Sequence, residues 1–213
     1  MVRTTRAARK PARPYHHGNL RRGLLDEALA TIRTDGVDGL TLREIGARLG
    51  VSRTALYRHF ADKRALLTAV ATEGFRMLRE QLVTAWEDGG TAAFESMGMA
   101  YIRFAAANPA HYRVMFGGFV EAVVQDAELA VEAAGAFQAL LDAITALQRD
   151  GVMRTEDPGL MATHVWALVH GIAMLAIDGQ LHGPATIDDL TRYAFDRLRS
   201  GIAIDATRQA KRR

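Results

Sequence analysis

Apolar residues recur along most of this chain at the three- and four-residue spacing of an α-helix, and no stretch shows the apolar–polar alternation of a half-buried strand. The first such run extends from about Gly18 to Asp35 and is followed by Gly36, a residue type that often ends a helix. Its apolar positions are Leu20, Leu24, Ala28, Leu29 and Ile32. The pattern predicts an all-α fold.

A short helix is predicted soon after this run, because its start carries two separate signals. Thr41 and Glu44 have the spacing of a capping box, in which a hydroxyl and a carboxylate each accept a bond from a free backbone amide. Leu40 and Ile45 occupy the positions of a hydrophobic staple across the same start. Gly50 then offers the left-handed conformation that a sharp helix end needs.

A second short helix is predicted to begin after Ser52, whose hydroxyl can cap it. Leu56 and Phe60 stand four residues apart and should face inward. Gly46, in the preceding helix, is small where the two helices must touch. The polar side chains beside or opposite the apolar pair are Arg53, Thr54, Tyr57 and Arg58. The two helices together predict a helix-turn-helix whose second helix lies in a DNA major groove.

Glycine, proline and capping residues divide the rest of the chain into six further predicted helices. Asp62 caps the first of these, Asp157-Pro158 supplies a cap with proline at the first helical position, and Thr186 with Asp189 opens the last. The predicted ranges are about 63–86, 91–107, 111–116, 121–149, 158–179 and 186–198. We therefore expect about nine helices, with the first of these six joining a three-helix head to a larger helical body.

Charge is distributed unevenly along the chain. Residues 1–64 contain 14 Lys/Arg against 6 Asp/Glu, a net charge of +8, whereas the remainder contains 13 against 18, a net charge of −5. A basic head on an acidic body is the layout of a nucleic-acid binder, although basic residues can also serve only to keep a surface soluble. Residues 1–17 carry five basic residues and no acid, which predicts either a disordered tail or an arm that contacts DNA.

Several classes of protein are disfavoured by what the sequence lacks. The chain has no cysteine, which excludes disulfides and thiolate metal sites, and we expect neither a metal nor a cofactor. No catalytic motif, glycine-rich phosphate loop or paired metal-ligand spacing is visible, so we expect no enzyme activity. The longest apolar stretch, Leu160 to Ile177, is interrupted by polar residues and is best interpreted as a buried or interfacial helix rather than a membrane span. We expect a cytoplasmic protein with no membrane partner.

The residues of the predicted helix-turn-helix carry a resemblance to a known family. The run from Leu40 to Phe60, followed by Asp62-Lys63-Arg-Ala-Leu-Leu67, resembles the DNA-binding domain of the tetracycline-repressor (TetR) family. The resemblance covers roughly residues 20–70, and Gly46 departs from it where the family usually has alanine. Further along, Trp166-Ala-Leu-Val-His170-Gly171 resembles the C-terminal domain of a subgroup marked by Trp, His and Gly.

The resemblance implies a domain organisation and a function. Residues 1–17 would form the arm, 18–64 the DNA-binding domain, 65–200 a ligand-binding and dimerisation domain, and 201–213 a basic tail. The implied protein is a transcriptional regulator, by default a ligand-responsive repressor that binds a palindromic operator on double-stranded DNA as a homodimer. An activator of the same fold and an architectural DNA-binding protein are the alternatives.

Eight residues are expected to contact DNA by this resemblance. Four of them should touch phosphates: Thr41, Tyr57, His59 and Lys63. Four should lie near bases: Arg43, Ser52, Arg53 and Thr54. A cation in the first turn of a helix, as at Lys63, is unfavourable against the helix dipole unless a phosphate also binds there.

The body is implied to hold a small effector and to dimerise through its last two helices. The apolar eighth helix agrees with dimerisation, because it needs cover on more than one side, although a buried central helix would look the same. An aromatic residue at helical spacing can line a pocket or simply fill the core. The candidate ligand-binding residues are Phe75, Leu78, Leu82, Trp86, Tyr101, Phe104, Tyr112, Phe116, Phe137, Leu141, Trp166, His170 and Met174. We expect a mainly apolar effector, with His170 or Tyr112 setting its orientation.

Overall fold

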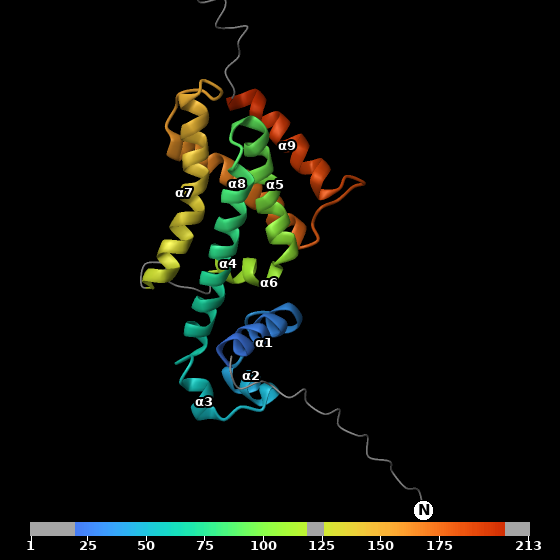
Figure 1. Cartoon of the computed structure of the whole chain (residues 1–213). Helices are drawn as coiled ribbons and strands as arrows, with labels where there is room; N and C mark the ends of the chain where they lie inside the picture. Colours follow the sequence, from blue (N-terminus) through green and yellow to red (C-terminus); the bar gives the residue numbers. More distant parts are fainter. Residues whose placement is uncertain (1–19, 119–125, 203–213) are drawn as a thin grey trace, which may run out of the picture.

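The computed structural model describes residues 20–118 and 126–202, and within these ranges the chain forms nine helices and no strand (Figure 1). The predicted all-α fold is confirmed. The predicted arm and most of the basic tail lie outside the described residues, as does the start of the helix expected from residue 121. The helices are α1 (Leu20–Asp35), α2 (Leu42–Leu49), α3 (Arg53–Tyr57), α4 (Lys63–Trp86), α5 (Gly90–Ala107), α6 (Pro109–Phe116), α7 (Ala127–Arg149), α8 (Pro158–Ile177) and α9 (Ile187–Ile202).

The turn between α2 and α3 is built by short-range contacts. The Thr41 hydroxyl accepts a hydrogen bond from the Glu44 amide at 3.3 Å and donates to the Glu44 carboxylate at 2.9 Å, so this carboxylate bonds the hydroxyl rather than the Thr41 amide. Gly50 has φ 67°, the left-handed conformation expected at this helix end. A Cβ on Gly46 would lie 2.8 Å from Leu56 Cδ1. The absence of a side chain at Gly46 thus allows the close approach of α2 and α3.

Helix α3 is shorter than the sequence pattern predicted. Ser52 caps it by accepting a bond from the Ala55 amide at 3.2 Å, but the helix ends at Tyr57 instead of continuing to Phe60. Phe60 is nevertheless 4% exposed, and its amide bonds the Leu56 carbonyl at 3.2 Å. The inward placement expected for Leu56 and Phe60 is therefore correct, while the second of them lies in the turn after the helix.

Helix α4 connects the head to the body (Figure 1). Asp62 caps it through the Ala65 amide at 2.8 Å, as its sequence predicted. Along its 24 residues it contacts α1 in the head and α5, α6 and α7 in the body. One continuous helix is therefore shared by both parts.

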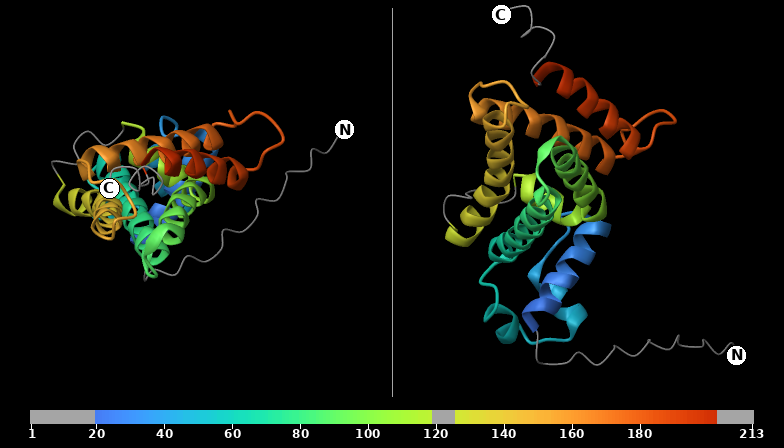
Figure 2. Two further views of the ribbon diagram at one scale, coloured as in Figure 1. Left: turned by 90° about the horizontal axis from the view of Figure 1, so that it is seen from above. Right: turned by 45° about the horizontal axis from the view of Figure 1, so that its top comes forward.

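The body is a bundle in which α8 and α9 lie side by side on one face (Figure 2). A capping box opens α9: the Thr186 hydroxyl accepts a bond from the Asp189 amide at 3.1 Å, and the Asp189 carboxylate accepts one from the Thr186 amide at 3.2 Å. By length and composition α7 and α8 could each cross a membrane, with mean hydropathies of 1.3 and 1.7. Both pack against α4 or α5 as members of the bundle.

Candidate DNA-binding head and ligand cavity

The residues expected to contact DNA come from α2, α3 and the start of α4. Seven of the eight have exposed side chains in the structure, and Lys63 is half-buried. Tyr57 is 47% exposed, which is unusual for an aromatic side chain next to the buried Leu56. The exposed seven are Thr41, Arg43, Ser52, Arg53, Thr54, Tyr57 and His59. This surface is polar and aromatic, and it is available to a nucleic acid.

The arginines of the head divide into two groups. Arg48 ion-pairs with Glu27 at 3.2 Å and with Asp35 at 3.6 Å, so its guanidinium ties α2 to α1. Arg43 and Arg53 form no ion pair within the described part of the chain. The Lys63 ammonium donates to the Asp38 carbonyl at 3.4 Å, next to the N-terminus of α4. The guanidinium groups of Arg43 and Arg53 and the Lys63 ammonium therefore have no acidic partner among the described residues.

A partly buried polar contact joins the head to the body. Arg22 on α1 donates to Glu73 on α4 at 2.5 Å, and the other Glu73 oxygen lies 3.2 Å from His111 Nε2 on α6. Burial lowers the pKa of His111, and the hydrogen bond to Glu73 only partly opposes this. Sequence analysis did not identify these three residues, because nothing in their local patterns signals a partner on another helix.

A cavity of about 360 Å³ lies inside the body between α4, α5, α6, α7, α8 and α9. No Asp, Glu, Lys, Arg or His lines it among the described residues. Its size and apolar wall are those of a site for a small molecule. The lining residues are Phe75, Leu78, Leu82, Phe94, Met97, Gly98, Tyr101, Met115, Phe116, Ala133, Ala136, Phe137, Leu140, Val165, Trp166, Val169 and Phe195.

Seven of the thirteen candidate ligand-binding residues line this cavity, and six do not. The lining seven are Phe75, Leu78, Leu82, Tyr101, Phe116, Phe137 and Trp166. The six that lie outside the lining are Trp86, Phe104, Tyr112, Leu141, His170 and Met174. Of these, Tyr112 and His170 still reach the wall indirectly, through hydrogen bonds to a lining residue.

Four side chains form a hydrogen-bonded cluster at one side of the cavity. Trp166 Nε1 donates to the Tyr101 hydroxyl at 3.1 Å, and the Tyr101 and Tyr112 hydroxyls lie 2.9 Å apart. His170 Nδ1 lies 2.7 Å from the Tyr112 hydroxyl and 3.2 Å from that of Tyr101. The cluster joins α5, α6 and α8. One of its members, Tyr101, is the only tyrosine among the described residues that line the cavity.

Burial keeps this cluster uncharged. It raises the pKa of Tyr101 to about 12, raises the pKa of Tyr112 as well, and lowers the pKa of His170. A neutral imidazole can accept at Nδ1 from Tyr112, or donate from Nδ1 in the other tautomer, and either direction satisfies the chain of hydroxyls. The Tyr101 oxygen can therefore accept a hydrogen bond from a molecule in the cavity or donate one to it.

Comparison with known proteins places this arrangement in a family. Residues 24–70 match the bacterial regulatory proteins of the tetR family, and residues 94–198 match the tetracyclin repressor-like C-terminal domain. The two matches cover most of the head and the body from α5 to α9, and leave out residues 71–93. The chain belongs to the TetR family. Its placement in the Trp/His/Gly-marked subgroup stays a prediction.

The similarity of this TetR-family chain to tetracycline repressors extends over about a quarter of its length. It is 43% identical over 53 residues to the class D tetracycline repressor protein of Escherichia coli, covering 25% of this chain and 24% of that repressor. It is 57% identical over 44 residues to the class A repressor from transposon 1721 of Escherichia coli, covering 21% and 20%. The chain thus spans about a quarter of the length of these curated relatives or less.

Solved structures resemble the TetR-family chain over almost its whole length. A protein of unknown function from Rhodococcus sp. RHA1 is 36% identical, with a TM-score of 0.79, covering 90% of this chain and 99% of that one. The TetR-family transcriptional regulator PfmR from Thermus thermophilus has a TM-score of 0.67 at 20% identity, covering 83% and 97%. The second similarity shows that the fold is shared.

The cavity of this TetR-family protein includes residues that sequence analysis missed. Most are small or aliphatic, but Phe94 on α5 and Phe195 on α9 are aromatic. Phe195 shares an apolar face of α9 with Leu198, three residues away, and that spacing could have marked it as inward-facing. The spacing does not reveal that the ring reaches the cavity, because this depends on how α9 docks on α5.

Proposed function

We propose that this TetR-family protein is a DNA-binding transcriptional regulator, by default a repressor, that binds a palindromic operator. A small apolar effector causes it to dissociate from that operator. One observation carries the proposal: a single helix, α4, starts beside the exposed recognition surface and later forms a wall of the apolar cavity. Phe75, Leu78 and Leu82 of α4 line that cavity. The similarity of the head to tetracycline repressors supports the same function.

The proposed DNA contacts divide by role. Tyr57, Thr41, His59 and Lys63 bind phosphates and fix the position of the head, while Arg43, Ser52, Arg53 and Thr54 lie against base edges in the major groove. The exposure of the α3 side chains makes them accessible to DNA. The exposed amides at the start of α4 and the adjacent Lys63 ammonium form a suitable place for one phosphate.

The proposed assembly is a cytoplasmic homodimer formed through α8 and α9. Large apolar side chains on these helices face solvent in the single chain: Leu160 is 74% exposed, Leu175 is 46% exposed and Tyr193 is 64% exposed. The two helices form one face of the body (Figure 2). A two-fold partner that covers this face would place two recognition helices on two halves of a palindrome.

The proposed effector is uncharged, mainly apolar and small enough for the cavity. A charged group would be desolvated there without an opposite charge to offset the loss, since no Asp, Glu, Lys, Arg or His lines the wall among the described residues. Tyr101, held by Tyr112, Trp166 and His170, supplies one hydrogen bond to a hydroxyl or carbonyl of the effector.

The proposed release mechanism uses the shared helix. An effector that presses on Phe75, Leu78 and Leu82 would tilt α4, and with it the head, so that two recognition helices no longer match the operator spacing. The contact of Glu73 with Arg22 and His111 lies on the same helix and transmits the tilt to α1. The coupling between effector and DNA should be about 1–3 kcal/mol, the usual range for coupling between two allosteric sites.

The DNA-binding part of the proposal is tested by selecting sequences bound by the purified protein from a random DNA pool. We expect a palindromic consensus, and we expect sedimentation analysis to show a dimer bound to each operator. A protein that stays monomeric at micromolar concentration and binds one half-site at a time would contradict the dimer. Equal affinity for selected and competitor DNA would instead indicate an architectural role.

The effector part is tested by screening small uncharged hydrophobic compounds for release of the selected operator. In the Trp166→Ala variant we expect effector affinity to fall by about tenfold, because the indole both lines the cavity and donates to Tyr101. His170→Ala should also weaken the response. Trp86→Ala is the matched control, since Trp86 lies outside the cavity lining. Release only by strongly anionic compounds would reject the proposed effector class.

A further inference from the structure

A second, smaller cavity lies next to the first and shares two side chains with it. Its volume is about 110 Å³, and its wall includes Phe94 of α5 and Phe195 of α9, which also line the cavity of about 360 Å³. The two rings meet edge to face, with centroids 6.0 Å apart and an interplanar angle of 70°. They therefore form the partition between the two spaces.

The position of Phe195 in this partition depends on a glycine. A Cβ added to Gly98 would lie 1.9 Å from Phe195 Cζ, so the ring rests directly on the backbone of α5. Phe195 is only 4% exposed. Any side chain at residue 98 would have to displace the ring, so the absence of one fixes Phe195 between the cavities.

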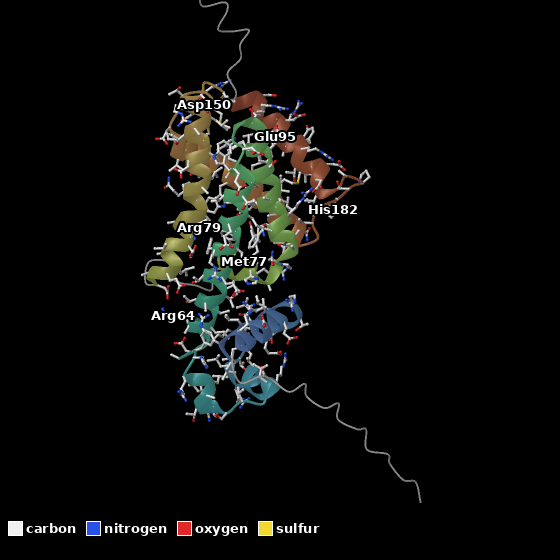
Figure 3. The ribbon with its side chains drawn as sticks, in the orientation of Figure 1. Arg64, Met77, Arg79, Glu95, Asp150 and His182 are labelled. Carbon is white, nitrogen blue, oxygen red and sulfur yellow. The ribbon has the colours of Figure 1, made fainter. Side chains whose placement is uncertain are left out.

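The second cavity is apolar inside and has a charged pair at its edge. Leu147, Met153 and Leu198 contribute to its wall. Glu95 and Arg199 also line it and form an ion pair at 3.0 Å, with side chains 39% and 49% exposed. Figure 3 labels Glu95 on α5, on the side facing α9. An alkyl chain could occupy this space up to the ion pair, but the two rings separate it from the first cavity.

We propose that Phe195 is the residue that sets the maximum length of the effector, by closing the first cavity at Gly98 and keeping the second cavity out of reach. The effector class is then a compact apolar molecule with one uncharged hydrogen-bonding group at Tyr101 and a short hydrocarbon part that ends at Phe195. A smaller side chain at residue 195 joins the two cavities and admits longer molecules. This inference rests on the proposed function of the cavity as an effector site.

The experiment measures binding of para-alkylphenols, from the ethyl to the nonyl member, to the full-length protein. The chain has two tryptophans, so a Trp86→Phe background leaves Trp166, on the cavity wall, as the fluorescent reporter. Each methylene moved from water into an apolar cavity strengthens binding by roughly fourfold. We expect affinity to rise along the series in the native background and to stop rising once the chain reaches Phe195.

In the Phe195→Leu variant we expect the rise to continue for further carbons, so that the longest members bind about tenfold tighter than to the native background. The short members should bind as before. Leucine keeps an apolar contact at Gly98, and Phe195→Met provides a second variant whose flexible side chain can move aside, should the first fail to fold. The helical signal in circular dichroism and the thermal unfolding curve show whether the two Phe195 variants are folded.

Two further variants test whether loss of the partition, rather than enlargement of the first cavity in general, changes the length limit. Phe195→Leu combined with Val152→Phe adds a ring at a residue that lines the second cavity, keeps Trp166 as the single reporter, and should restore the native length limit. Phe137→Leu makes the same change on a ring that lines only the first cavity, and should leave the limit where it was. The proposed role of Phe195 is overturned if the length limit is unchanged in both Phe195 variants. It is also overturned if Phe137→Leu shifts the length limit as far as the Phe195 variants do. If no alkylphenol of any length quenches Trp166 in the native background, the effector site itself is rejected.

Discussion

Replacing Phe104 by alanine is expected to lower the free energy of unfolding by about 3–5 kcal/mol, as for other fully buried aromatic side chains. Phe104 lies on α5 and is 1% exposed, yet it does not line the cavity. Its ring fills the core, and removing it leaves an unfilled space between packed helices. Urea unfolding of the purified protein, followed by circular dichroism, measures the loss.

Phe137→Ala is the control for this substitution. Phe137 is half-buried, lines the cavity and packs edge to face on Trp166 with ring centroids 6.2 Å apart. We expect this variant to lose less stability than Phe104→Ala and to bind apolar effectors more weakly. At a temperature where both variants are folded, Phe104→Ala should keep its effector affinity. A stable Phe104→Ala protein, or one with selectively lost effector binding, would show that the ring belongs to the site rather than the core.

The Arg53→Ala substitution is expected to relax selectivity at one base pair of the operator by ~1–3 kcal/mol, the value of one good contact between a side chain and a base. Arg53 is the first residue of α3, is exposed and forms no ion pair within the described residues. Tyr57→Ala should instead weaken binding to all sequences about equally, because a phosphate contact carries no sequence information. Binding to a panel of single-base operator variants measures both effects.

Arg48→Ala is the matched arginine control for the DNA experiment. Arg48 is also exposed and lies on the neighbouring helix, but it is engaged by Glu27 and Asp35 of α1. Its loss should leave the ranking of operator variants unchanged. If Arg53→Ala also left that ranking unchanged, the result would falsify the assignment of Arg53 to base recognition. Weaker binding of Tyr57→Ala to every operator variant, with both the ranking and the salt dependence unchanged, would support its assignment to a phosphate, because a neutral hydroxyl releases no counterion.

The local structure of the head could be predicted from sequence because its signals act over three or four residues. Thr41 with Glu44, Ser52 with Ala55, and Asp62 with Ala65 are contacts within a single helical turn. Such contacts form wherever these residue types stand at this spacing, whatever the rest of the chain does. The end of α3 was harder to predict. Phe60 lies in the turn after the helix, but it is buried four residues after Leu56, the same spacing that a continued helix would give.

The cavity could be predicted only in part, because helical spacing marks an apolar face without saying what that face meets. Phe75, Leu78 and Leu82 face the cavity, whereas Trp86 on the same helix lies outside its lining. Phe104 is three residues from the lining Tyr101 and fills the core instead. Which aromatic rings surround an empty space depends on where six helices leave a gap, and no single helix contains that information.

The sequence by itself determined most of the helices, their caps and the basic head, since each follows from neighbouring residues or from the charge of one segment. The tertiary structure alone decided three long-range features. Glu73 meets Arg22 and His111 across 51 and 38 residues of sequence, Tyr101 meets His170 across 69, and Phe195 closes the cavity against Gly98. In each case the partners are brought together by the crossing of separate helices, so neither residue's local sequence can specify the other.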